Sequence, residues 1–160
     1  MLAQTLGAFC AAAVVYANYK SAIDVYEGGS HIRTVPPALN ATAGVFCTYP
    51  QTFMSRTGQF FSEFIDSTIL MFVIFALKDE GNLPSGINTP LALFFLIFGL
   101  GACWGYETGY AMNFARDFGP RLFTYMIGYG HEVWSAGNYY FWVCPSFTLF
   151  NSLNMALIFS

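Results

Sequence analysis

The sequence predicts an all-α membrane protein with four transmembrane helices and one re-entrant half-helix. Of its 160 residues, 56% are hydrophobic and only 9% are charged, whereas soluble domains carry roughly 25% charged residues. Four apolar segments each approach the roughly 20 residues that a helix needs to cross hydrocarbon. A stretch with glycine, charge and aromatic residues separates the last two of them, and irregular backbone near a membrane needs protein or a cavity around it.

The first predicted helix covers residues 1–19 and is rich in alanine and glycine. Small residues let helix backbones approach closely, so we expect this helix to be buried. The connection that follows, 21–59, is long and polar, with turn signals at 28–29, 36–37 and 49–50. We interpret it as an ordered loop or a flap on the solvent side.

The second and third predicted helices cover residues 60–77 and about 89–106. The short, charged turn between them, 78–86, predicts that they are antiparallel neighbours. Pro90 suits the first turn of the third helix, because proline is favoured at that position. The fourth predicted helix covers 139–159.

Residues 107–125 are predicted to form the re-entrant loop and half-helix. Asn113 can cap the half-helix, since its side-chain oxygen can accept an unpaired N–H of the first turn, and Asp117 near that end agrees with the helix dipole. A half-helix N-terminus at mid-bilayer offers donors and positive charge to a permeating hydroxyl, while Arg116 repels cations. Pro120 should kink the half-helix, because it removes a backbone hydrogen bond.

The segment 113–117 resembles the second signature loop of the major intrinsic protein family, Asn-Pro-Ala-Arg followed by the Asp of the aquaglyceroporin branch. The resemblance includes 60–64, 79–82 and 139–142, and fungal-type members are the most similar. Phe114 departs from the family, which has proline at this position. The larger ring could tilt the half-helix or plug the constriction.

The resemblance also implies roles for individual residues. Glu63 resembles a structural anchor that accepts hydrogen bonds from backbone donors of the pore loop. Asp66 replaces a small residue of the family and receives no role. The residues expected to form the pore and its selectivity filter are Gly101, Tyr110, Asn113, Ala115, Arg116 and Asp117.

The family implies a passive channel for glycerol, water and small neutral solutes in a lipid bilayer, assembled as a homotetramer and located in the plasma membrane. Residues 1–160 resemble a single partial aquaporin-like domain, the C-terminal portion of the family fold. We therefore expect a second half of the channel that does not conduct alone. The alternative is a non-conducting membrane subunit that associates with full-length relatives.

Other classes of function are not expected. Glu63 and Asp66 lie three residues apart on one predicted helix without a nucleophile or metal partner, which makes a poor active site. The six scattered basic residues do not form the stripe that a nucleic acid needs. We therefore expect no catalytic residue, no cofactor and no metal, because the cysteines also lack metal-binding spacing: Cys10, Cys47, Cys103 and Cys144.

Overall fold

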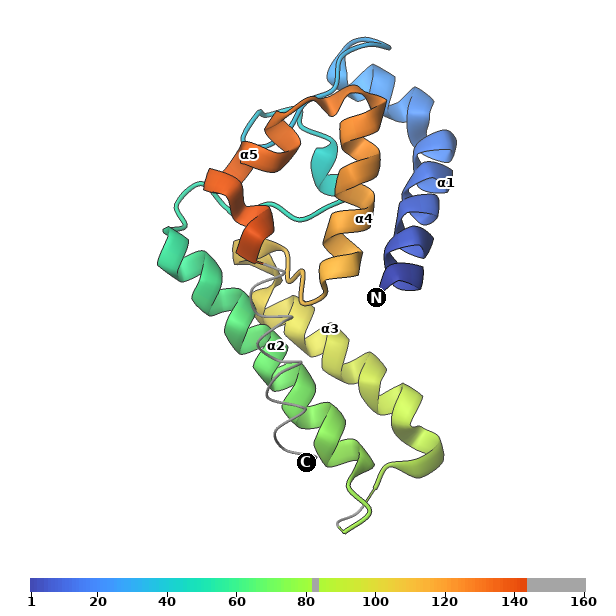
Figure 1. The fold of residues 1–160 in the computed structure, drawn as a ribbon, viewed down its shortest axis with the longest axis vertical. Helices are drawn as coiled ribbons and strands as arrows, with labels where there is room; N and C mark the ends of the chain where they lie inside the picture. The colour runs from blue at the N-terminus through green and yellow to red at the C-terminus, as the bar shows by residue number, and fades with distance from the viewer. Residues whose placement is uncertain (82–83, 144–160) are drawn as a thin grey trace.

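The computed structural model of the chain describes residues 1–81 and 84–143 and is all-helical within these ranges. Figure 1 shows two groups of helices: α2 and α3 form a hairpin, while α1 and α4 lie side by side beyond its open end. The α-helices are α1 (Leu2–Glu27), α2 (Arg56–Lys78), α3 (Thr89–Thr108), α4 (Phe114–Thr124) and α5 (Glu132–Tyr139). Shorter turns are η1 (Ala43–Val45), η2 (Gly86–Asn88), η3 (Tyr125–Tyr129) and η4 (Tyr140–Trp142).

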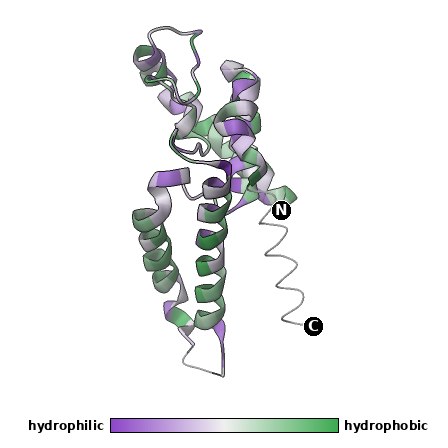
Figure 2. Cartoon of the chain, turned by 90° about the vertical axis from the view of Figure 1, so that its left-hand side faces the viewer, coloured by the Kyte–Doolittle hydropathy of each residue, from purple (hydrophilic) through white to green (hydrophobic). Residues whose placement is uncertain are grey.

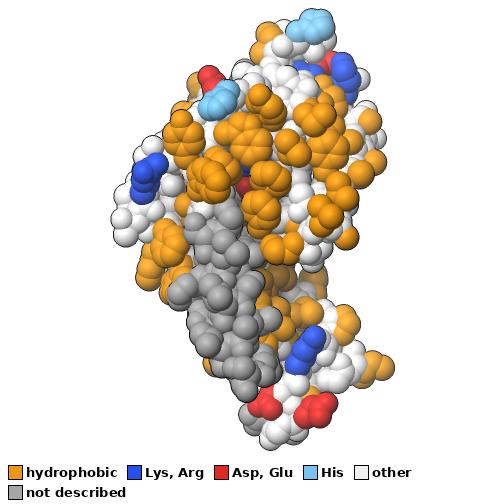
Figure 3. Space-filling model, in the orientation of Figure 1, with side chains coloured by type: hydrophobic (Ala, Val, Ile, Leu, Met, Phe, Trp, Pro, Cys, Tyr) orange, Lys and Arg blue, Asp and Glu red, His pale blue; other side chains and the backbone are white. Residues whose placement is uncertain are grey.

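Three helices are long and apolar enough to span a membrane: Leu2–Glu27, Arg56–Lys78 and Gly86–Thr108. The α2–α3 hairpin is mostly hydrophobic along its length (Figure 2), and hydrophobic side chains cover most of the upper face in Figure 3. Large side chains such as Phe72 and Phe98 are 72% and 67% exposed. Lipid accepts such a surface, whereas water does not, and the protein is therefore an integral membrane protein.

Helix α1 extends further than the sequence predicted. The prediction ended at Tyr19, but the helix continues to Glu27, where Gly28 adopts the left-handed conformation (φ 87°) that commonly ends a helix. The added turns contain charged side chains, so a prediction based on the length of the apolar segment ended the helix before them.

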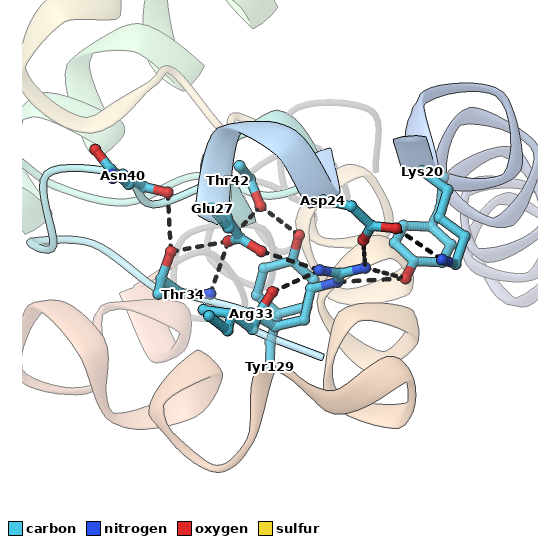
Figure 4. A network of polar contacts seen from close by, with 10 residues as sticks. Lys20, Asp24, Glu27, Arg33, Thr34, Asn40, Thr42 and Tyr129 are labelled. Atoms are coloured by element: carbon cyan, nitrogen blue, oxygen red, sulfur yellow. Dashed lines mark hydrogen bonds and ion pairs between the residues drawn. The ribbon is translucent and has the colours of Figure 1, made fainter. Parts of the chain in front are cut away.

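A polar network compensates the charges at this end of α1 (Figure 4). Arg33, from the following loop, forms ion pairs with Asp24 at 2.6 Å and with Glu27 at 3.2 Å. Glu27 also accepts the hydroxyl of Thr42 at 2.7 Å, and that hydroxyl lies 2.6 Å from the hydroxyl of Tyr129 in η3. The network joins α1, the loop and the end of the half-helix region.

Helices α1 and α4 approach each other at Gly119. A Cβ atom added to Gly119 would lie 2.6 Å from the carbonyl oxygen of Thr5 and 3.1 Å from the Cβ of Ala8. The close approach through small residues follows the sequence prediction, but the expectation of a buried helix is wrong for this chain, because only one side of α1 packs against α4 and the loop. The buried residues of α1 are Ala12, Ile23 and Glu27.

The α2–α3 hairpin is antiparallel, as the short turn predicted. Helix α2 begins at Arg56, one turn before the expected residue 60, because the side chain of Ser55 caps it by accepting the N–H of Gly58 at 3.1 Å. Helix α3 has Pro90 in its first turn and ends at Thr108.

Helix α4 continues through Pro120 to Thr124, with the proline inside the helix. The regular helix then gives way to η3, a π-helical turn in which Gly128 has φ 108°. Helix α5 was not predicted. Of the predicted last helix, 139–159, only residues 139–143 are described: Tyr139 ends α5 and Tyr140–Trp142 form the 3₁₀ turn η4. Residues 144–159 lie outside the described part.

Candidate functional site

The loop between α3 and α4 has an unusual backbone. Gly109, Tyr110 and Met112 have φ values of 84°, 40° and 49°. Glycine adopts this left-handed conformation freely, but for other residues sparsely populated backbone costs of order 1–3 kcal/mol and persists only where the surroundings impose it. The loop therefore needs an external anchor.

Glu63 of α2 supplies the contacts that hold this loop. Its carboxylate is fully buried and accepts the backbone N–H of Ala111 at 3.0 Å and that of Met112 at 3.1 Å. The hydroxyl of Tyr140 donates to the same carboxylate at 2.6 Å. The backbone hydrogen bonds that we expected for Glu63 are present, and they fix the two residues that precede Asn113.

Asn113 begins the half-helix. Its backbone is extended (φ −143°, ψ 122°), and its Oδ1 accepts the N–H of Ala115 at 2.8 Å. Helix α4 therefore starts at the residue that the capping pattern indicated. Capping leaves other N–H groups of the first turn available, together with the positive end of the helix dipole.

Two hollows meet at Arg116, whose side chain is exposed. The first, of about 450 Å³, lies between α1 and α4 and is also lined by Gln4, Asn113 and Ala115. The second, of about 480 Å³, is lined by Arg116, Tyr110 and residues of the long loop. Arg116 thus lies between a groove along α4 and a hollow of similar volume that the long loop lines.

Tyr110 packs against α3 at two glycines. A Cβ atom would lie 3.2 Å from the Tyr110 ring at Gly101 and 2.8 Å from it at Gly105. The structure thus brings Gly101 to Tyr110 and Tyr110 to Arg116. However, Gly101 lines a third, largely apolar hollow of about 620 Å³ on α3 rather than the two that meet at Arg116.

Asp117 is buried and points toward the long loop. One carboxylate oxygen accepts the backbone N–H of Thr48 at 2.8 Å and its hydroxyl at 2.6 Å. The other accepts the Nε of Arg121 at 2.8 Å. The residues lining the two hollows at Arg116 do not include Asp117. Its contacts join α4 to the loop.

Sequence reasoning assigned no role to Arg121, which is fully buried. Besides Asp117, its guanidinium donates to the carbonyl oxygens of Val133 at 2.6 Å and Thr48 at 2.5 Å. It also lies 4.7 Å from the centre of the Tyr49 ring, and burial raises the pKa of that phenol. The i, i+4 spacing of Asp117 and Arg121 was the one signal in the sequence that could have indicated this pair.

Phe114 takes the first helical position, where the family has proline. Its ring stacks on that of Phe118 at 4.7 Å between centroids, and Phe118 in turn contacts Trp134 at 5.8 Å. The residues lining the two hollows at Arg116 do not include Phe114. In this structure the ring neither plugs these hollows nor prevents α4 from starting at its cap.

Comparison with known proteins identifies relatives of this arrangement. The sequence model of the family described as "Major intrinsic protein" matches residues 1–148. The chain is 73% identical over 144 residues to aquaglyceroporin-9 of Botryotinia fuckeliana, covering 89% of this chain and 31% of that protein. It is 72% identical over 142 residues to probable aquaglyceroporin-2 of Gibberella zeae, covering 89% of this chain and 42% of that protein.

A solved structure resembles the fold as well. The X-ray structure of the aquaglyceroporin from Plasmodium falciparum aligns with a TM-score of 0.72 at 30% identity, covering 89% of this chain and 54% of that one. The chain therefore spans between about a third and about half of the length of these relatives. By name, all three relatives are channels and not enzymes.

Proposed function

We propose that this chain, which belongs to the major intrinsic protein family, forms one half of the wall of a passive channel for glycerol, water and other small neutral solutes. The observation that carries the proposal is the position of Arg116 and Asn113. Both line a groove beside the capped start of α4, and Arg116 also faces the hollow that contains Tyr110. A solute that follows these two hollows passes hydrogen-bond donors on one side and an aromatic ring on the other.

The chemistry of this path suits polyols. Arg116 offers fixed N–H donors to hydroxyl groups, whereas its positive charge opposes the entry of cations. The Tyr110 ring, held against α3 by its contacts at Gly101 and Gly105, offers an apolar surface to the carbon backbone of glycerol. Asn113 and the free donors of α4 continue the polar side of the path.

In this proposal the residues that line the path differ from those that hold it. Glu63 fixes the strained loop through Ala111 and Met112. Asp117 and Arg121 hold α4 against the long loop. We assign them positioning roles, because their polar atoms are engaged by backbone and side chains of the protein.

The chain as it stands supplies part of a pore wall, so we expect that its 160 residues alone conduct glycerol poorly. The path needs walls on all sides, and the two fungal relatives are about two to three times as long as this chain. Plasma-membrane location and a tetramer complete the proposed channel. The rival proposal, favoured by the same difference in length, is a non-conducting subunit that associates with longer relatives.

Glycerol uptake by proteoliposomes separates these functions. The chain alone, the chain fused to the first half of a fungal aquaglyceroporin, and empty liposomes are compared at equal protein density. We expect uptake above background for the fusion only. A fusion that inserts and folds but takes up no glycerol would contradict the channel proposal, and co-purification of the chain with a full-length relative would then favour the subunit.

A further inference from the structure

The loop between α1 and α2 contains a sequence pattern that the proposed channel does not use. Asn40, Ala41 and Thr42 form the acceptor pattern for N-glycosylation, which is asparagine, any residue except proline, and then serine or threonine. The pattern occurs once in the 160 residues. Because a three-residue pattern often arises by chance, its meaning depends on how the structure presents these residues.

The structure presents Asn40 on an exposed turn. The N–H of Ala41 donates to the carbonyl oxygen of Ala38 at 3.1 Å and closes this turn. Residues 37–40 are all exposed. Leu39, next to Asn40, is 98% exposed, the highest fraction among the large hydrophobic side chains of the described residues. A glycan is bulky and solubilising, so this turn has room for one, and a glycan here would shield Leu39 from water.

The rest of the loop holds the base of this turn through the backbone. The Thr34 hydroxyl donates to the carbonyl oxygen of Asn40 at 2.9 Å, and the N–H of Ala43 donates to the carbonyl oxygen of Thr34 at 3.3 Å. Asn40 thus meets the network of Figure 4 through its main-chain oxygen. The residues lining the two hollows at Arg116 do not include Asn40. A group attached to its amide nitrogen therefore leaves both the network and the proposed solute path in place.

Thr42, the third residue of the pattern, is buried. Its hydroxyl donates to Glu27 at 2.7 Å and lies 2.6 Å from the hydroxyl of Tyr129. The acceptor pattern is limited to serine and threonine at this position, so the reaction depends on the hydroxyl. In the folded chain that hydroxyl is engaged inside the protein. Glycan transfer must therefore precede the packing of the loop against α1 and η3.

The loop is connected to helices that can cross a membrane. Helix α1 ends at Glu27 and α2 begins at Arg56, and both are long and apolar enough to span a membrane. In Figure 1 the loop lies at the upper end of the molecule and the turn between α2 and α3 at the lower end. Because α2 is a single span, its two connections lie on opposite sides of the membrane.

We propose that Asn40 carries an N-linked glycan, added before the loop folds, and that this loop faces the lumen of the endoplasmic reticulum during synthesis. The amide Nδ2 of Asn40 forms a bond to C1 of the first sugar and gives up one proton. The bond between C1 and the diphosphate of a lipid-linked oligosaccharide breaks, and the lipid diphosphate leaves with the electron pair. The transferase and this donor come from the host cell. The proposal does not depend on which solute the protein conducts.

Expression of the full 160-residue chain in yeast tests the modification. We expect the chain in the membrane fraction to show one discrete step of reduced electrophoretic mobility that endoglycosidase H removes. Asn40→Gln should lack the step and melt at the same temperature as the deglycosylated chain, because Asn40 contacts the network through its backbone. Thr42→Ser keeps the hydroxyl and should retain the step. Asn18→Gln changes an exposed asparagine outside any acceptor pattern and is the matched control, which should also retain it.

Cell-free synthesis with microsomes tests the timing. The chain is made in the presence of a competing acceptor tripeptide, which is removed after insertion is complete. The folded chain should then acquire no glycan, whereas Glu27→Ala, which removes the acceptor of the Thr42 hydroxyl, should acquire it late. The proposal is overturned if the inserted chain shows no mobility step in yeast, if Asn40→Gln keeps the step, or if the unmodified chain and Glu27→Ala are modified late to the same extent. These readouts are independent of glycerol uptake, so a failed uptake assay leaves them valid.

Discussion

At the scale of single residues, the first helical position of α4 shows that a departure from the family sequence can leave the local fold unchanged. Phe114 stands where the family has proline, a residue that is preorganised for this position. The structure nevertheless starts the helix there, because Asn113 supplies the cap and the Phe114 ring is stacked on Phe118. The ring therefore packs on the side of α4 that carries Phe118, away from the two hollows at Arg116.

This interpretation predicts the effect of removing the ring. Phe114→Ala should lower the free energy of unfolding by at least about 0.5–1.5 kcal/mol, the contribution of an aromatic pair beyond its buried area, and should not raise glycerol uptake by the fused channel. Uptake by the fusion and chemical unfolding in detergent measure the two effects. A marked gain in uptake for Phe114→Ala or Phe114→Pro would mean that the ring blocks the path.

Arg121 is the residue whose loss should be most costly. Arg121→Met removes the cation from a buried pair and leaves Asp117 without its ion-pair partner, which costs about 3–5 kcal/mol. Arg116→Met on the same helix removes an exposed cation and serves as the control, with an expected change below about 0.5 kcal/mol. Unfolding of both variants in detergent measures the difference, and similar losses would argue against a buried pair.

At the scale of elements, the sequence predicted those helix boundaries that depend on residues close to them in the chain. The start of α4 follows from the Asn113 cap, and the hairpin of α2 and α3 follows from the short turn between two apolar segments. The end of α1 was missed because Asp24 and Glu27 are compensated by Arg33, which lies beyond the helix in the sequence. Such partners become visible only once the loop has folded back.

In the candidate site, too, local features could be predicted and contacts between distant residues could not. The cap at Asn113 could be predicted from its residue type and position, and the hydrogen bonds of Glu63 from the resemblance to the family. The arrangement around Arg121 could not, since it requires carbonyl oxygens of Thr48 and Val133 that are distant in the sequence. The separation of Gly101 from Arg116 likewise depends on where the Tyr110 ring lies.

The packing of α1 on α4 provides a test at this scale. Gly119→Ala introduces a Cβ 2.6 Å from the carbonyl oxygen of Thr5, and overpacking of this kind costs about 1–3 kcal/mol. Gly7→Ala on α1 meets nothing within 4 Å and should be neutral or slightly stabilising, because alanine favours helices over glycine. Thermal unfolding of the two variants in nanodiscs compares them directly. Equal stability of the two variants would show that α1 and α4 separate easily.

At the scale of the whole molecule, the two groups of helices contribute different residues to the candidate site. The α2–α3 hairpin carries Glu63, which anchors the loop between α3 and α4, and α1 and α4 line the groove at Asn113. The loop between α3 and α4 joins the groups, and the network at the end of α1 ties the long loop to η3. The proposed solute path follows the line where the groups meet, at Arg116.

Solute selectivity of the fused channel tests this central claim most directly. Arg116→Ala removes the charge and the fork of donors together, whereas Arg56→Ala removes an exposed arginine at the start of α2 that donates to the carbonyl oxygen of Asn138. Proteoliposome uptake is measured for glycerol, for a larger polyol and for a small cation. We expect Arg116→Ala to admit the larger polyol and the cation relative to glycerol, and Arg56→Ala to behave as the unmodified fusion. Unchanged selectivity in Arg116→Ala would contradict the proposal that solutes pass this residue.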